Sequence, residues 1–177
     1  MRRAWLALLA LAVPTGTPDF APGQGTARVA LHSSAFVDGG PIPQRYTCDG
    51  ANVAPPLEWS APPPGTRAWA LLVVDPDAPG GRFVHWVLID LPARTRRLAE
   101  GAVPPGARQG RNDFGRLGWC GPCPPPGHPH RYVFRLYALR GPTGLPSGAT
   151  AAQLERALRG RVLAIGQLTG RYGRGPR

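Results

Sequence analysis

The feature that most constrains this chain is the way glycine and proline interrupt its apolar segments. The 177 residues include 24 Gly and 23 Pro, spread between short apolar runs. Neither residue continues a helix or a strand well, so the pattern favours short strands joined by many turns. The hydrophobic content of 42% is enough for a packed core, and the length suits one domain.

Five apolar runs rich in β-branched or aromatic residues are predicted as strands, at residues 27–32, 67–75, 82–90, 131–139 and 161–169. Residues 76–81 hold two prolines and two glycines, so a wide turn is expected between the second and third strands. One late helix is predicted near 150–159, because Thr150 and Gln153 can form a capping box and Gly160 follows. The irregular segment from 91 to 130 is long enough to expect function there.

The N-terminus has the pattern of a secretory signal peptide. Two arginines follow Met1, and Ala4–Val13 carries no charge. This apolar stretch is too short to span a bilayer, and a polar break follows it. Residues 1–26 are therefore predicted to be a signal peptide and flexible leader before a single domain at 27–177, which implies a periplasmic or secreted protein. If Met1–Val13 is instead an ordinary buried segment, the protein would be cytoplasmic.

The formal net charge is +11, and every one of the 21 basic residues is arginine. The absence of lysine excludes Schiff-base chemistry through lysine and a P-loop lysine. The arginines are scattered along the chain, with no run longer than a pair. A generally solvated basic surface with some attraction for anions is expected, and a nucleic-acid partner is not.

The sequence Asp-Pro-Asp-Ala-Pro at residues 75–79 follows an apolar strand. Phosphatases with an aspartyl nucleophile carry a similar motif, but they need a lysine and alternating helices, which this chain lacks. A simple Asp-Pro turn is the remaining structural interpretation. His85 lies on the next predicted strand, where Asp75 could fix its tautomer. Strict alternation would place His85 on the same face as Phe83, Val87 and Ile89.

The segment Trp119–Cys123 matches the thioredoxin active-site sequence. Three prolines follow at 124–126, so the helix that lowers the thiol pKa in thioredoxin cannot form. A redox role is therefore not favoured. The stiff loop continues into a strand on which His130, Tyr132 and Phe134 share a face, and a stiff loop beside a histidine suits a preorganised anion site.

Taken together, these motifs resemble the phosphatidylethanolamine-binding (Raf-kinase-inhibitor-like) family, in its bacterial branch. The motifs in order are Tyr46–Gly50, Asp75–Pro79, His85-Trp86, Asn112–Gly115, Gly121–Pro125, His130–Tyr132, Tyr137–Leu139 and Gly170–Arg174. The resemblance runs from about Val29 to Arg174. It implies a mainly β fold, with a large antiparallel sheet packed on a smaller one and few helices.

The resemblance also implies a ligand pocket. Its residues would be Asp75, His85, Gly121, Pro122, Cys123, Pro124, Pro125, His130 and Tyr132. Members of the family bind phosphate, acetate or a phospholipid head group in this place, and no catalytic reaction is assigned to the family as a whole. In the matching branch Cys48 and Cys123 are the usual pair of cysteine positions. This implies a Cys48–Cys123 disulfide with Cys120 free, and Cys48–Cys120 is the rival pairing.

Three classes of function remain open. Non-catalytic binding of a phosphate-type anion or phospholipid head group is the primary hypothesis, without a cofactor or metal. The alternative is an inhibitor or interaction protein that docks a protease, kinase or phospho-peptide at the same pocket. An enzyme is disfavoured, since no activated nucleophile stands beside Asp75, His85 and His130. A homodimer and peripheral membrane contact are both compatible with the sequence.

Overall fold

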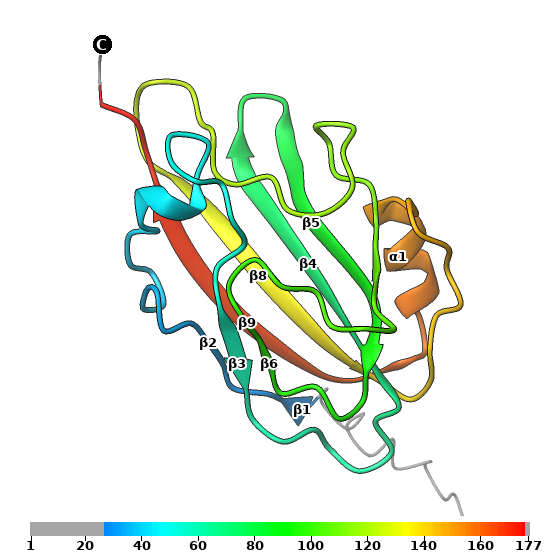
Figure 1. Ribbon diagram of the computed structural model, residues 1–177. Coiled ribbons are helices and arrows are strands. Elements are labelled where there is room, and N and C mark those ends of the chain that lie inside the picture. The colour runs from blue at the N-terminus through cyan, green and yellow to red at the C-terminus, as the bar shows by residue number, and fades with distance from the viewer. Residues whose placement is uncertain (1–26, 176–177) are drawn as a thin grey trace, which may run out of the picture.

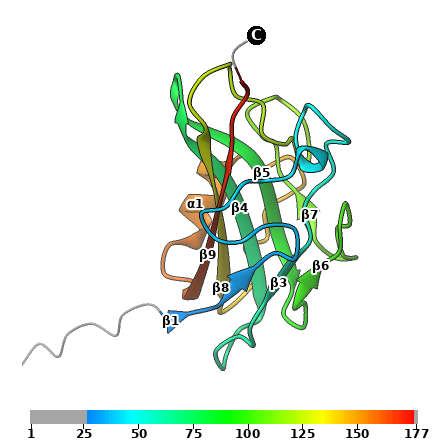
Figure 2. The ribbon, with the colours of Figure 1, turned by 90° about the vertical axis from the view of Figure 1, so that its left-hand side faces the viewer.

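The computed structural model describes residues 27–175. These residues form a six-stranded sheet, a three-stranded sheet and one α-helix (Figures 1 and 2). The large sheet has the order β1-β9-β8-β4-β5-β7 and the small sheet the order β2-β3-β6. The elements are β1 (Ala27–Arg28), β2 (Leu31–His32), a 3₁₀ turn (Gln44–Tyr46), β3 (Leu57–Trp59), β4 (Ala68–Ala78), β5 (Gly81–Pro92), β6 (Arg97–Leu98), β7 (Arg108–Gln109), β8 (His130–Leu139), α1 (Ala151–Leu158) and β9 (Val162–Tyr172).

The four long strands β4, β5, β8 and β9 pair antiparallel and correspond to four of the predicted strands. The sheet is nevertheless mixed, because β1 pairs parallel with β9. The predicted first strand is in fact two short strands: β1 joins the large sheet, while β2 joins the small sheet. The chain therefore crosses between the two layers at residues 29–30, so no single strand can span 27–32.

Two apolar layers cover the two faces of the large sheet. Between the sheets, Trp69, Leu71 and Phe134 pack with residues of the small sheet such as Leu57 and Trp59. On the other face, α1 covers the sheet with Leu154 and Leu158. The side chain of Thr150 caps this helix, and Gln153 completes the capping box, as the sequence predicts.

The expected wide turn at residues 76–81 is wrong. Strand β4 continues through Pro76 to Ala78, and only residues 79–80 lie between it and β5. The pairing of β4 with β8 ends at Val74, and the register with β5 shifts between Asp75 and Ala78. Pro76 thus lies on a bulged strand extension where its missing N–H breaks no ladder hydrogen bond. The resulting hairpin projects beyond the sheet (Figure 1).

Candidate functional site

The carboxylate of Asp75 holds the side chain of His130. Asp75 lies near the end of β4 and is 3% exposed. Its Oδ2 is 2.8 Å from Nδ1 of His130, and its Oδ1 accepts a 2.8 Å hydrogen bond from the backbone N–H of Asp77. Both carboxylate oxygens are therefore engaged by the protein. Asp75 fixes the orientation of the His130 ring, and the predicted Asp–His pairing involves His130 instead of His85.

His85 is held by the loop that precedes β8. Its Nδ1 lies 2.6 Å from the carbonyl oxygen of Cys120, and the N–H of Cys120 donates to the carbonyl of His85. A carbonyl oxygen only accepts, so Nδ1 carries the proton and Nε2 is the remaining polar atom of the neutral ring. Burial is the main cause that lowers the pKa of His85, with the Cys120 carbonyl opposing it.

The face on which His85 lies differs from the prediction. The register of β5 against β4 shifts between Val73, paired with Trp86, and Val74, paired with Val84, so His85 is the extra residue of a β-bulge. The bulge reverses the alternation: Val87 and Ile89 pack under α1, while the His85 ring contacts Tyr132 on the other face, with ring centres 5.1 Å apart.

A disulfide joins Cys48 and Cys123, with Cα atoms 5.4 Å apart, and leaves Cys120 as a buried free thiol. The guanidinium of Arg174 donates to the Sγ atom of Cys48 at 2.8 Å and also pairs with Asp49. Cys123 is followed directly by Pro124 and Pro125. The cross-link therefore fixes the start of a stiff proline loop against the segment that contains Cys48.

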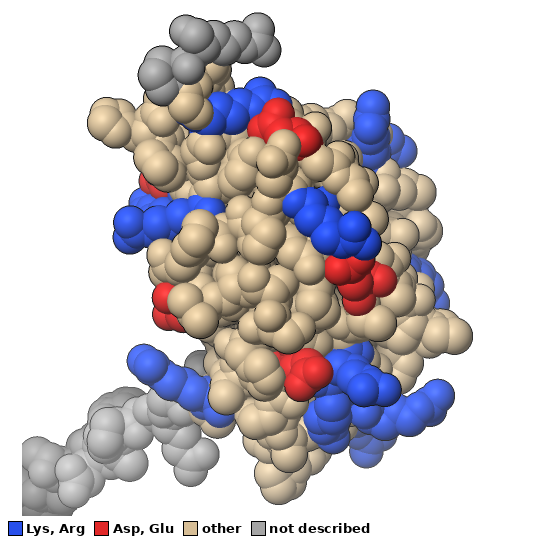
Figure 3. All heavy atoms as spheres, turned by 60° about the vertical axis from the view of Figure 1, so that its left-hand side comes forward, with Lys and Arg blue, Asp and Glu red and all other residues tan. Residues whose placement is uncertain are grey.

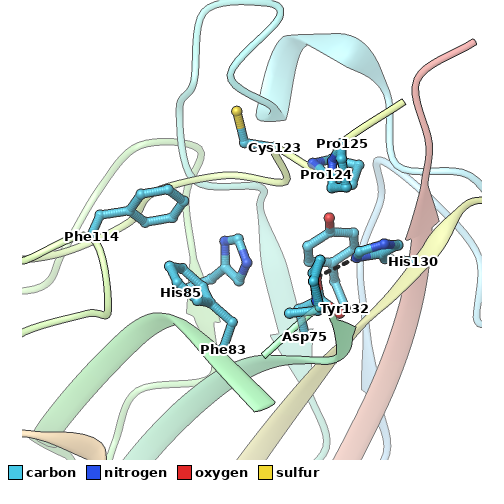
Figure 4. Close-up of a pocket in the computed structure, with 11 residues that line it drawn as sticks. Asp75, Phe83, His85, Phe114, Cys123, Pro124, Pro125, His130 and Tyr132 are labelled. Carbon is cyan, nitrogen blue, oxygen red and sulfur yellow. Dashed lines mark hydrogen bonds and ion pairs between the residues drawn. The ribbon is translucent and has the colours of Figure 1, made fainter. Parts of the chain in front are cut away.

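These elements surround one cavity of about 210 Å³ at the end of the large sheet. In Figure 4 the two imidazoles lie on either side of Tyr132, and Pro124 and Pro125 lie above. Phe114 lies at the left, on the side of the cavity away from His130. Most of the wall is apolar. The lining residues are Asp75, Ala78, Pro79, Phe83, His85, Phe114, Cys123, Pro124, Pro125, His130 and Tyr132.

Seven of the nine predicted pocket residues line this cavity, and Gly121 and Pro122 do not. The N–H of Gly121 donates to Oδ1 of Asn52, and the carbonyl of Pro122 accepts from Cys48. A side chain at position 121 would meet the carbonyl oxygen of Tyr46. These two residues are buried behind the wall and support it.

The sequence analysis did not assign Phe83 and Phe114 to the pocket. Phe114 lies on a turn that Asn112 organises: the Oδ1 atom of Asn112 accepts from the backbone N–H groups of Phe114 and Arg116, both at 3.0 Å. Asp113 ties this turn to β5 through the N–H of Val84, at 2.7 Å. The Asn112–Gly115 motif was visible in the sequence, but only the fold places it beside the cavity.

Tyr132 brings a further polar group to the cavity wall. Its hydroxyl is buried and has no hydrogen-bond partner within the described part of the chain. Burial, reinforced by the negative charge of Asp75, raises the pKa of Tyr132 far above its usual value, so the hydroxyl keeps its proton. Within residues 27–175 there is no group of three metal-ligating side chains that could hold a metal ion.

Comparison with known proteins assigns the family. The sequence profile of the phosphatidylethanolamine-binding protein family matches residues 32–173. A UPF0098 protein of Aquifex aeolicus is 45% identical over 156 residues, covering 85% of this chain and 91% of the relative. The chain belongs to the phosphatidylethanolamine-binding protein family. It lies in the branch that contains the bacterial and archaeal UPF0098 proteins.

Solved structures of family members have the same fold. Escherichia coli YbcL, described as a new member of the mammalian family, superposes with a TM-score of 0.78 at 33% identity, covering 84% of this chain and 99% of YbcL. The Chlamydia trachomatis homologue CT736 superposes with a TM-score of 0.79 at 39% identity, covering 83% of this chain and 98% of CT736.

A further family relative bears on location. The Mycobacterium tuberculosis protein named "Putative lipoprotein LppC" is 41% identical over 152 residues, covering 85% of this chain and 75% of the relative. Together with the Cys48–Cys123 disulfide, this relative points to a location outside the cytoplasm. No helix in the described range is long and apolar enough to cross a membrane. The predicted signal peptide and leader, residues 1–26, lie outside the described residues.

Proposed function

We propose that the cavity binds a small phosphate-type anion, free or as a phospholipid head group, without catalysing a reaction. The observation that carries the proposal is the arrangement of His85 and His130. They come from two different strands, and each is secured through Nδ1, to the Cys120 carbonyl and to the Asp75 carboxylate respectively. Each ring therefore has a single nitrogen, Nε2, left for a ligand.

The protonation of the rings decides which ligand this cavity accepts. Because burial lowers the pKa of His85, its Nε2 is an unprotonated acceptor when the cavity is empty near neutral pH. An anion oxygen is also an acceptor, so a proton must be added before the two can bond. Either the ligand brings it, as a protonated phosphate does, or the imidazole takes it up from solution. The hydroxyl of Tyr132 can supply a further hydrogen bond, provided the wall around it opens slightly.

The size and walls of the cavity favour a small anion. Its volume of about 210 Å³ lies below the roughly 300–1,000 Å³ usual for drug-sized ligands. Phenylalanine and proline side chains exclude water, which strengthens hydrogen bonds to an ion. The sulfur of Cys123 is bonded to Cys48, and the remaining hydroxyl, that of Tyr132, has a raised pKa. Neither is an activated nucleophile, which supports binding without turnover.

The test is a titration of the purified protein with phosphate and with phosphorylethanolamine, followed through the histidine resonances by NMR at pH 6 and 7.5. We expect saturable shifts at His85 and His130. The variants His85→Ala and His130→Ala should each lose the saturable response, and similar affinities for both ligands would show that the phosphate group is what is recognised.

Two other histidines provide matched controls. His32 is exposed on β2, and His128 is exposed on the loop before β8 but does not line the cavity. His32→Ala and His128→Ala should bind as the unchanged protein does. A folded protein in which all four histidine signals stay flat would overturn the proposal, and turnover of a generic phosphoester that His85→Ala abolishes would replace it with an enzyme.

Docking of a protein partner is a second candidate, and Phe114 favours it. Its side chain lines the cavity and remains 44% exposed at the rim, as a contact for a protease, kinase or phospho-peptide would be. If this candidate holds, Phe114→Ser should abolish capture of the partner.

We further propose that the protein works in the periplasm or is secreted. The disulfide and the lipoprotein relative support this location. Mass spectrometry of the chain isolated from cell fractions would test it. Recovery of the intact chain, starting at Met1, from the cytoplasm would contradict it.

A further inference from the structure

Three arginines lie together at the end of the large sheet that is opposite the cavity, where its long strands begin or end. Arg67 precedes β4, Arg140 follows β8 and Arg161 precedes β9. The N–H of Arg67 donates to the carbonyl of Leu139, and the N–H of Arg140 donates to the carbonyl of Arg161. These bonds bring three cationic residues that are far apart in the sequence to one place.

Further arginines extend this cluster. The turn after β5 carries Arg94 and Arg96, and the pairing of Pro92 with Ala68 places that turn beside the start of β4. Arg159 is the C-cap of α1, two residues before Arg161. We call this set the basic end; its members are all exposed, and they are Arg67, Arg94, Arg96, Arg140, Arg159 and Arg161. Figure 3 shows arginines gathered at the lower end of the face in view.

Carboxylates do not neutralise the basic end. Within residues 27–175, none of its six arginines forms an ion pair. Two carboxylates lie near this end in the sheets: Glu58, in register with Arg97, and Asp90, two residues before Pro92. Glu58 pairs with His32 at 3.4 Å, while Asp90 is nearly buried and accepts from Thr143, Gly144 and Arg108. Six like charges without counter-ions create a local positive potential that an anionic surface would relieve.

The composition of the basic end favours a lipid surface over a nucleic acid. The large apolar side chains exposed in the described part of the chain are Val37, Phe114 and Leu117, and none belongs to this end. The basic end therefore lacks an exposed aromatic side chain on which a base could stack. The arginines are exposed on strand ends and turns, where each can approach the negative surface potential of an anionic membrane. The disulfide also indicates an oxidising compartment outside the cytoplasm.

We propose that the basic end adsorbs to an anionic phospholipid surface and holds the cavity away from it. From Ala68 at the basic end, β4 reaches Asp75 at the cavity after seven residues, which is about 23 Å of strand. That distance is well above the screening length of about 8 Å in physiological salt, so the two ends act independently. If the anion site proposed above is correct, its ligand then comes from solution and not from the membrane that holds the protein.

The experiment is co-sedimentation of the protein with vesicles of phosphatidylcholine, alone or with 30% phosphatidylglycerol. The variant replaces four arginines of the basic end: Arg67→Gln, Arg94→Gln, Arg140→Gln and Arg161→Gln. A matched control removes the same charge elsewhere, at exposed arginines without ion pairs: Arg111→Gln, Arg116→Gln, Arg135→Gln and Arg171→Gln. Each arginine near an anionic surface contributes roughly fivefold.

We expect the unchanged protein to bind only the anionic vesicles and to be released by about 0.5 M salt. The basic-end variant should bind them about 100-fold more weakly or worse, and the control should lose far less. Equal losses in the two variants would show a general charge effect and overturn the proposal. So would binding to neutral vesicles, or tighter binding to a DNA duplex than to the anionic vesicles.

A further variant separates this inference from the proposed function. His130→Ala should abolish phosphate binding without changing vesicle binding, and the basic-end variant should do the reverse. If His130→Ala weakens vesicle binding, the cavity faces the membrane and the orientation proposed here is wrong. If phosphate does not bind at all but the basic-end variant still loses the vesicles, the anion site fails and the docking surface stands.

Discussion

The two ends of the large sheet differ in how many of their arginines form ion pairs with carboxylates. At the cavity end, three arginines are paired with carboxylates, Arg131 with Asp77, Arg82 with Glu155 and Arg174 with Asp49, although Arg116 and Arg171 form no ion pair within the described chain. The polar groups left for a ligand there are two imidazoles and a phenol. At the basic end the arginines have no carboxylate partners within the described chain. The binding proposed for the first end would therefore depend on hydrogen bonds in a largely apolar cavity, and the adsorption proposed for the second would depend on net charge.

Two aspartates with largely buried side chains show a similar difference within the sheet. Asp75 on β4 uses one oxygen to orient a cavity histidine. Asp90 on β5 directs both oxygens to structure: it accepts from the N–H and hydroxyl of Thr143, from the N–H of Gly144 and from Arg108. The same side chain is thus a positioning group for the cavity at one end and a loop anchor at the other.

The largest effect is expected from removing the disulfide that fixes the cavity wall. The variant Cys123→Ser opens a cross-link that spans 75 residues, which should lower the free energy of unfolding by about 2–5 kcal/mol and weaken phosphate binding. Urea unfolding and the phosphate titration measure both effects. Cys120→Ser is the control and should be mild; if it is as damaging as Cys123→Ser, the bonded pair in solution is Cys48–Cys120.

The paired variants Asp75→Asn and Asp90→Asn separate the roles of the two aspartates. Each should lower the free energy of unfolding by about 1–3 kcal/mol, because a buried acceptor of charge-assisted hydrogen bonds is lost. Asp90 has a φ of 55°, which asparagine also tolerates, so the backbone should be preserved.

Only Asp75→Asn should weaken phosphate binding, by roughly tenfold, as the loss of a histidine-orienting partner usually does. Calorimetric titration of both variants measures this. Equal losses of affinity would mean that Asp75 acts through general stability and does not position His130.

A smaller effect is expected from pH, and sulfate isolates it because sulfate stays a dianion between pH 6 and 7.5. The pKa of His85 is lowered in the folded protein, so the unfolded chain binds protons more readily. The empty protein should therefore lose stability as pH falls through the ordinary histidine value of about 6.5.

Sulfate binding works in the opposite direction, because it needs a protonated imidazole. Its affinity should rise by roughly threefold or more from pH 7.5 to 6, with proton uptake visible as a dependence of the binding heat on the buffer. An affinity that is flat across this range would show that no histidine takes up a proton on binding.

The smallest effect is expected at the partly exposed Asp77–Arg131 pair, which lies beside the cavity but outside its lining. Arg131 lowers the pKa of Asp77 to about 2, so its stabilising effect is present above the ordinary value near 4 and is lost as pH falls toward 2. Asp77→Asn should cost less than about 1 kcal/mol at pH 7. Phosphate affinity should change less than twofold; a larger loss would place Asp77 in the site.

The sequence predicted which residues line the cavity better than it predicted how their side chains are arranged. The family motifs pointed to Asp75, His85, His130 and the proline loop, and all of these reach the cavity. The pairing of Asp75 with His130, instead of with its sequence neighbour His85, depends on β8 lying next to β4 in the sheet. Proximity in the sequence favours His85 as the partner of Asp75, because His85 lies on β5, the next strand along the chain. The imidazole that reaches Asp75 is instead that of His130 on β8.

The sequence by itself determined the four long strands, the capped helix and the residue types of the pocket, because alternation, capping and proline placement are local properties. Only the tertiary structure decided the rest. The bulge at His85 changes the face on which its ring lies, Pro76 continues β4 beyond its last pairing with β8, and scattered arginines meet at one end of the sheet. Each of these outcomes depends on which strands become neighbours, and pairing over a long sequence separation leaves no local signal to read.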